Sequence, residues 1–179
     1  MLLGQKEAGD DWQVRWLAFS LNQAKVEEGG TDVWDDPAMT SARTAVEVGI
    51  AVRDGWPERF PAVHRALFAA RHDHGLDLRD GKVLADVLAA EGLDPTRVFD
   101  EIGAGKPREA FRAEHQTAVD DHQVFGVPTV IVGDRATFVR LVDRPGDDAG
   151  DARRAVDRIL DLMTGWPNLN EFKHTTIPH

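Results

Sequence analysis

The chain has 179 residues, of which 42% are hydrophobic and 29% are charged, a composition typical of a folded globular protein. Its formal net charge of −10 disfavours binding to nucleic acid or to an anionic membrane through bulk electrostatics. The sequence contains no cysteine, which excludes disulfides, cysteine-ligated zinc and a thiol nucleophile among these residues, and its histidines show no metal-binding spacing, so we expect no metal site.

The first predicted element is a strand over residues 13–21, where β-branched and aromatic residues alternate with others. Its mostly apolar character suits a strand that is covered on both faces. Residues 22–36, which include Gly29-Gly30, are predicted to form a loop.

A block of helices is predicted next, at residues 37–53, 57–73, 80–91, 94–101 and 106–123. Asp36-Pro37 and Asp94-Pro95 each place a helix-capping side chain directly before a proline, which is favoured at the first helical position. Gly92 is predicted to end the third helix of the block.

Two strands at residues 129–132 and 137–142 follow, separated by a turn at Gly133-Asp134. A final helix is predicted over residues 151–163, and Gly165-Trp166-Pro167 ends it. The order of a strand, a helical block, two strands and a helix indicates a sheet that is interrupted by a helical insertion.

Residues 125–134 read Phe-Gly-Val-Pro-Thr-Val-Ile-Val-Gly-Asp. Proline cannot donate to a strand ladder, so Pro128 belongs either in a tight turn with a cis peptide bond or, as an ordinary trans proline, at the start of the strand. The run resembles the cis-proline loop of thioredoxin folds. That resemblance implies that Val127 offers its backbone to a substrate thiol or disulfide and that Thr129 helps to fix the loop.

Several further stretches, in the same order along the chain, resemble the actinobacterial DsbA-like proteins typified by mycothiol-dependent nitroreductases. They are Val14-Arg15-Trp16 with Phe19-Ser20-Leu21; Leu67 with Arg71-His72-Asp73-His74-Gly75; Phe111-Arg112-Ala113-Glu114-His115; Gly126-Val127-Pro128-Thr129; and Trp166-Pro167 with Glu171-Phe172-Lys173. The resemblance covers nearly the whole chain and implies an α/β, thioredoxin-like fold with a helical insertion domain. Residues 1–24 and 124–179 would form the thioredoxin-like portion, and residues 25–123 the insertion.

In that family a Cys-Pro-x-x motif stands at the start of the first helix, where the helix N-terminus stabilises the thiolate. This sequence resembles the family only after that motif, so we expect the fold to lack its first β-strand. The missing strand would lie between the strand at residues 13–21 and the strand after Pro128, and unpaired strand edges inside a protein are unfavourable. We therefore expect either that Met1 is an internal methionine of a longer protein or that another segment fills the gap.

Three other side chains are candidate pocket residues. His115 falls on the apolar stripe of its helix, and we favour a buried, hydrogen-bonded core histidine; the alternative implied by the resemblance is a residue that tunes the thiolate or binds the thiol cofactor. Trp34, in the loop before the helical block, is the preferred pocket residue among the tryptophans. His72 matches a recurrent family position and is expected to be exposed at a helix end.

The resemblance implies a DsbA-family thiol–disulfide oxidoreductase, mycothiol-linked in its full-length form, whose catalytic cysteines are absent from this chain. No covalently bound cofactor is expected; mycothiol or another low-molecular-weight thiol is the cofactor, and a small-molecule thiol or electrophile is the partner. Two alternatives remain: an enzyme similar to glutathione transferase kappa and 2-hydroxychromene-2-carboxylate isomerase, which use serine to orient a thiol cofactor, or a non-catalytic binding module.

The cellular location and the remaining partners are predicted from what the sequence does not contain. Its start, Met-Leu-Leu-Gly-Gln-Lys-Glu-Ala-Gly-Asp-Asp, has no basic segment followed by an apolar one, and no apolar run approaches the length of a membrane span. We therefore expect a cytoplasmic protein that has neither nucleic acid nor a membrane as a partner; a homodimer stays open.

Overall fold

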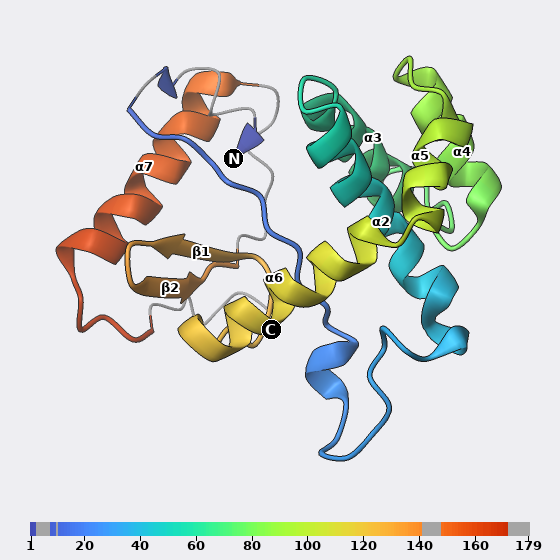
Figure 1. Ribbon diagram of the computed structural model, residues 1–179. Helices are drawn as coiled ribbons and strands as arrows, with labels where there is room; N and C mark the ends of the chain where they lie inside the picture. Colours follow the sequence, from blue (N-terminus) through green and yellow to red (C-terminus); the bar gives the residue numbers. More distant parts are fainter. Residues whose placement is uncertain (3–7, 10, 141–147, 172–179) are drawn as a thin grey trace. The chain divides into compact units, whose positions relative to one another are not determined.

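The computed structural model describes residues 1–2, 8–9, 11–140 and 148–171. The chain divides into two compact units, Met1–Trp16 with Gly126–His179, and Leu17–Phe125, and each is described by itself. The architecture is α/β, mostly helical with a small two-stranded sheet in the described residues (Figure 1). The domain boundaries expected from the sequence, with an insertion at residues 25–123, stay a prediction.

The Leu17–Phe125 unit is helical. Its elements are η1 (Gln23–Lys25), η2 (Pro37–Met39), α2 (Thr40–Gly55), α3 (Phe60–His72), α4 (Gly81–Ala90), α5 (Pro95–Gly103) and α6 (Lys106–His122). Helix α2 packs against α3, α5 and α6, so it lies at the centre of the unit. The fully buried aliphatic side chains come from α2, α3, α4 and α5 at helical spacing: Val48, Val52, Val63, Leu84, Leu88 and Val98.

Aspartate side chains cap the starts of three of these helices, at the two predicted positions, Asp36 and Asp94, and also at Asp80. The side chains of Asp36, Asp80 and Asp94 accept hydrogen bonds from the backbone N–H groups two residues ahead. Each cap satisfies a backbone donor that the first helical turn leaves unpaired. The Asp-Pro starts of the first and fourth predicted helices are therefore confirmed, although a short 3-10 turn, η2, precedes α2.

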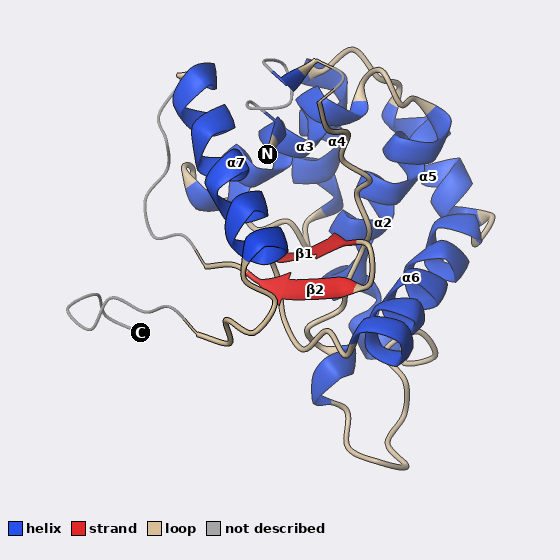
Figure 2. Ribbon diagram, turned by 90° about the vertical axis from the view of Figure 1, so that its left-hand side faces the viewer, coloured by secondary structure: helices blue, strands red, loops and turns tan. Residues whose placement is uncertain are grey.

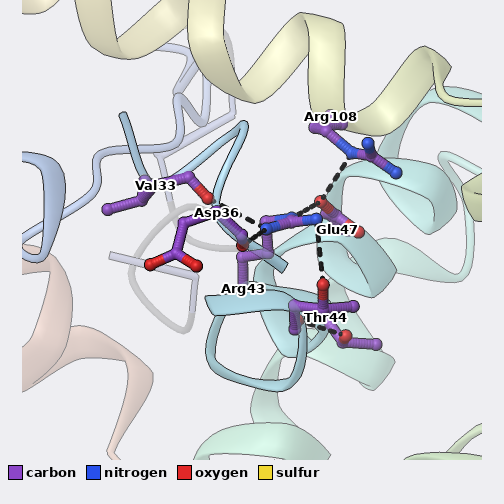
Figure 3. A network of polar contacts seen from close by, with 7 residues as sticks. Val33, Asp36, Arg43, Thr44, Glu47 and Arg108 are labelled. Carbon is purple, nitrogen blue, oxygen red and sulfur yellow. Dashed lines mark hydrogen bonds and ion pairs between the residues drawn. The ribbon is translucent and has the colours of Figure 1, made fainter. Parts of the chain in front are cut away.

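A buried polar network joins α2 to the loop in front of it (Figure 3). Arg43 Nε lies 3.0 Å from Glu47 Oε1, and the two side chains are 7% and 2% exposed. Arg43 Nη1 also donates to the backbone carbonyls of Val33 (2.9 Å) and Asp36 (3.2 Å). Arg43 thus compensates the buried carboxylate and fixes the end of the loop, while Arg108 Nε stands 3.7 Å from the same Glu47 oxygen.

The other unit contains a β-hairpin and one long helix. Strands β1 (Thr129–Val132) and β2 (Arg135–Phe138) pair antiparallel, with Val132 opposite Arg135 and Thr129 opposite Phe138. Helix α7 (Ala149–Gly165) packs against β1 (Figure 2). Arg135 Nη1 donates to the Met163 carbonyl at 3.0 Å, which satisfies a carbonyl in the last turn of α7.

The second strand of the hairpin starts earlier than predicted. The sequence suggested residues 137–142, whereas β2 is Arg135–Phe138, and residues 141–142 lie outside the described part of the chain. The reason is that Gly133 takes a left-handed φ of 62°, which lets Gly133-Asp134 close a two-residue turn with Arg135 already in the ladder.

The prediction of a strand at residues 13–21 was wrong. These residues belong to neither strand of the described sheet. The alternation that suggested a strand is present in the burial of the side chains: Val14 and Trp16 are partly buried, whereas Arg15 and Leu17 are exposed. The alternation does not continue to the end of the segment, because Phe19 is also partly buried and packs against His115. Without a ladder partner the segment is not a strand.

Candidate functional site

The loop before β1 is held by two short-range hydrogen bonds. The Val127–Pro128 peptide bond is cis. The Thr129 hydroxyl donates to the Gly126 carbonyl at 2.6 Å, and the Val139 N–H donates to the Pro128 carbonyl at 3.0 Å. Two carbonyls of the loop are therefore occupied by partners in its own hairpin, which fixes the backbone on both sides of Val127.

Gly126 allows an aromatic side chain to lie against this loop. A Cβ atom at Gly126 would stand 3.3 Å from one ring carbon of Phe138, closer than most real Cβ contacts, and 3.6 Å from a second, an ordinary contact distance. The ring of Phe138 therefore lies on the backbone at Gly126, while 41% of the residue stays exposed. Val127, the next residue, is 44% exposed, so the loop presents apolar surface to solvent.

His115 of α6 is buried and hydrogen-bonded, as the favoured prediction stated. The residue is 4% exposed, and its Nδ1 accepts a hydrogen bond from the Ser20 N–H at 3.3 Å. Its ring centroid lies 4.5 Å from that of Phe19 and 5.8 Å from that of Trp34. Because Nδ1 accepts, it is the unprotonated ring nitrogen in this contact.

The surroundings of His115 favour its neutral form. Burial lowers the pKa of His115 below its ordinary value, and the negative charge of Asp32 opposes that effect in part. Asp32 is itself paired with Arg112, whose Nη2 lies 3.1 Å from its Oδ2.

Glu114, the neighbour of His115 on α6, makes a second contact with the same extended segment. Its Oε2 accepts from the Ala18 N–H at 2.6 Å, and Arg53 of α2 binds both carboxylate oxygens, at 3.0 Å and 2.7 Å. Burial lowers the pKa of Arg53, but its hydrogen bonds to Asp54 and Glu114 outweigh that effect and the pKa is raised. Arg53 therefore keeps its positive charge beside the Glu114 carboxylate.

Of the candidate residues, the structure brings Trp34 and His115 together. Trp34 is 4% exposed and packs edge-on against Phe111 at a centroid distance of 4.7 Å, within a core cluster that includes Val33 and Ile50. Its contact with a ligand stays a prediction. His72 is exposed at the last position of α3, as expected, and its ring lies 5.5 Å from that of Phe68.

Three candidate residues, Val127, Pro128 and Thr129, belong to the unit that contains the hairpin, whereas Trp34, His72 and His115 belong to the helical unit. Within the described residues no group of three or more His, Cys, Asp or Glu side chains is placed to hold a metal ion. No helix in the described part of the chain is both long enough and apolar enough to cross a membrane.

Sequence reasoning missed Glu114, Arg53 and Phe138. The signal for Glu114 was weak: it directly precedes His115 but lies off the apolar stripe of its helix, where a charged side chain is normally solvated. Phe138 could have been found from Gly126, because a glycine before a short strand often marks the close approach of another group.

Comparison with known proteins adds a family to this geometry. The family model described as "DSBA-like thioredoxin domain" matches residues 3–144, which include the helical unit, the loop at residues 126–129 and the hairpin. A search of curated proteins finds no match. Together with the α/β architecture, the family match confirms the predicted thioredoxin-like fold class.

Proposed function

Because the chain belongs to the DSBA-like thioredoxin domain family, a family of thiol–disulfide oxidoreductase-like proteins, we propose that it supplies the thiol-binding loop of such an enzyme. The proposed ligand is mycothiol or another low-molecular-weight thiol, as in the actinobacterial, mycothiol-linked branch of the family. The catalytic cysteines are proposed to lie outside these 179 residues, because the sequence contains none. The observation that carries the proposal is that the family match includes residues 126–129.

The geometry of the loop supports binding by backbone contact. Val127 is exposed, and the hydrogen bonds of Thr129 to Gly126 and of Val139 to Pro128 hold the backbone on either side of it. A thiol carried on an extended, peptide-like group would pair with the N–H and C=O of Val127 in the manner of an added strand. A loop that is already fixed loses little conformational entropy when the ligand binds.

The residues of this chain bind and orient a thiol but do not exchange it. Thiol–disulfide exchange begins when a thiolate attacks a disulfide sulfur, and no side chain here provides a thiolate. The 179-residue protein should therefore show no thiol-dependent turnover of its own. A cytoplasmic location, where thiols are kept reduced, is part of the proposal.

The absence of cysteine favours a second candidate, a non-catalytic module that binds thiols or thiol-bearing proteins through the same loop. It also leaves open an enzyme similar to glutathione transferase kappa and 2-hydroxychromene-2-carboxylate isomerase, in which a serine orients the thiol cofactor. The three candidates differ at the position of the family's Cys-Pro-x-x motif. The oxidoreductase has cysteine before the proline, the isomerase-like enzyme has serine there, and the binding module lacks the motif.

The test is an assay of the natural gene product, purified from its source cells, with its mass measured intact. The oxidoreductase proposal expects a product longer than 179 residues that carries Cys-Pro, reduces a model disulfide with mycothiol as the electron donor, and loses this activity when that cysteine is replaced by serine. A product with Ser-Pro at that place would favour the isomerase-like alternative. A product of 179 residues without turnover would contradict the oxidoreductase and favour the binding module.

A further inference from the structure

Two neighbouring side chains of α6 bind one edge of an extended segment. The N–H groups of Ala18 and Ser20 donate to Glu114 Oε2 and His115 Nδ1, at 2.6 Å and 3.3 Å. In an extended chain the N–H groups of residues two apart point to the same side, where a neighbouring strand would normally accept them. Here a carboxylate and an imidazole take that place.

Ser20 connects this edge to the next turn of the chain. Its hydroxyl accepts from the Gln23 N–H at 3.1 Å, and its carbonyl accepts from the Ala24 N–H at 3.1 Å, so Ser20 holds the first two residues of η1. The side chain of Gln23 in turn accepts from the Val33 N–H at 2.9 Å and donates to Asp32 at 2.7 Å. The position of Ser20 is therefore coupled to that of the loop that carries Trp34.

The two acceptors on α6 differ in what acid does to them. Glu114 accepts from Ala18 through a carboxyl oxygen that Arg53 also binds, and a carboxyl group keeps acceptor oxygens whether or not it carries a proton. His115 accepts only while Nδ1 carries no proton, because the imidazolium ion has two donors and no acceptor. With the residue 4% exposed, a charge on its ring would also be buried.

We propose that the His115–Ser20 contact is a proton-sensitive switch: protonation of His115 Nδ1 releases the Ser20 N–H and loosens η1 with the loop at residues 32–34, while Glu114 continues to hold Ala18. This inference concerns the helical unit alone and does not depend on the proposed function.

The groups that face His115 determine whether the His115–Ser20 contact is formed at neutral pH or in acid. Asp32, in the loop, favours protonation of His115, but its charge is partly compensated because Arg112 pairs with it. On α6, the charge of Glu114 is compensated by its ion pair with Arg53 of α2. The rings of Phe19 and Trp34 cover the imidazole and favour its neutral form. Burial outweighs the charge of Asp32, so the contact is formed at neutral pH and broken in acid.

Amide hydrogen exchange at Ser20 and Ala18 in the 179-residue protein tests the switch, with protection factors corrected for the intrinsic pH dependence of exchange. As the pH is lowered stepwise from about 7.5, the protection of Ser20 should fall relative to that of Ala18, by roughly tenfold once His115 is protonated, the factor expected from the loss of one hydrogen bond. His115→Gln keeps a side-chain acceptor but cannot titrate, so the ratio should become independent of pH. His64→Gln is the matched control, because His64 is partly buried and its pKa is also lowered by burial, and this variant should leave the response unchanged.

The switch is refuted if Ser20 and Ala18 lose protection in parallel, or if His115→Gln responds to acid as the unmodified protein does. Should acid unfold the whole unit, core amides such as that of Val48 will exchange together with Ser20; the switch then requires that His115→Gln unfolds at a lower pH, and equal pH values would overturn it. If His115→Gln does not fold, the ratio of Ser20 to Ala18 in the unmodified protein decides alone.

Discussion

Replacing Arg43 by methionine should destabilise the helical unit strongly, because it leaves Glu47 buried without its main partner. Glu47 is 2% exposed, and its closest ion-pair contact is Arg43 Nε at 3.0 Å (Figure 3). The same arginine donates to the carbonyls of Val33 and Asp36, so the substitution also removes the donors that fix the loop before α2.

Removal of one partner of a buried pair lowers the free energy of unfolding by about 3–5 kcal/mol. Arg108 Nε, 3.7 Å from Glu47 Oε1, remains as a weak partner, so we expect a value near the lower end, about 3 kcal/mol. The double variant Arg43→Met with Glu47→Leu removes the buried charge as well. It should recover at least about half of that loss, with the remainder due to the two carbonyls, each worth about 1 kcal/mol.

Urea unfolding followed by circular dichroism measures these differences. Lys82→Met is the control, because it breaks the Lys82–Asp86 pair, whose side chains are 78% and 66% exposed, and it should leave the urea midpoint almost unchanged. A loss below about 1 kcal/mol for Arg43→Met, or a double variant no more stable than the single one, would show that the network does not compensate Glu47 as described.

Further predictions concern acid, a helix cap and a turn. Burial lowers the pKa of both His64 and His115, so the unfolded chain binds protons at these histidines more readily than the folded protein does. The stability that the neutral histidines contribute should be complete above about pH 6.5 and should be lost as the pH falls toward their lower pKa values in the folded protein. Urea titrations at stepped pH would show this loss. Asp94→Ala removes the cap of α5 and should lower the free energy of unfolding by about 1 kcal/mol, and an unchanged urea midpoint would contradict this. Gly133→Ala, at a φ of 62°, should lower the free energy of unfolding by about 1–2 kcal/mol. Gly49→Ala lies within α2, where nothing lies within 4 Å of the added Cβ, and it should raise the free energy of unfolding by about 0.5–1 kcal/mol. Equal effects of the two substitutions would refute the role of the turn conformation at Gly133.

Features that depend on a few adjacent residues could be predicted from the sequence. Asp36-Pro37 and Asp94-Pro95 mark helix starts because the cap and the proline act within one turn. The segment at residues 13–21 shows the limit of this reasoning. Its alternation was real, but a strand also needs a partner, which local pattern cannot reveal.

The same limit applies to the candidate site. The loop at residues 126–129 could be located from glycine and proline, and the burial of His115 from its place on an apolar stripe. The contacts of Glu114 could not be predicted, because Arg53 and Ala18 lie 61 and 96 residues away in the sequence. A lone glutamate on a helix gives no sign that it binds a backbone N–H so far along the chain.

The most direct test of the account is whether the loop at residues 126–129 binds a thiol. Reduced mycothiol would be titrated into the isotopically labelled 179-residue protein while amide chemical shifts are followed, with a Val127→Pro variant, which lacks the N–H proposed to pair with the ligand, as the control. The account predicts saturable shifts centred on the amides of Val127 and Thr129 in the unmodified protein, and clearly weaker binding by the variant. Saturable shifts centred away from this loop, equal binding by the two proteins or no saturable shift would contradict it.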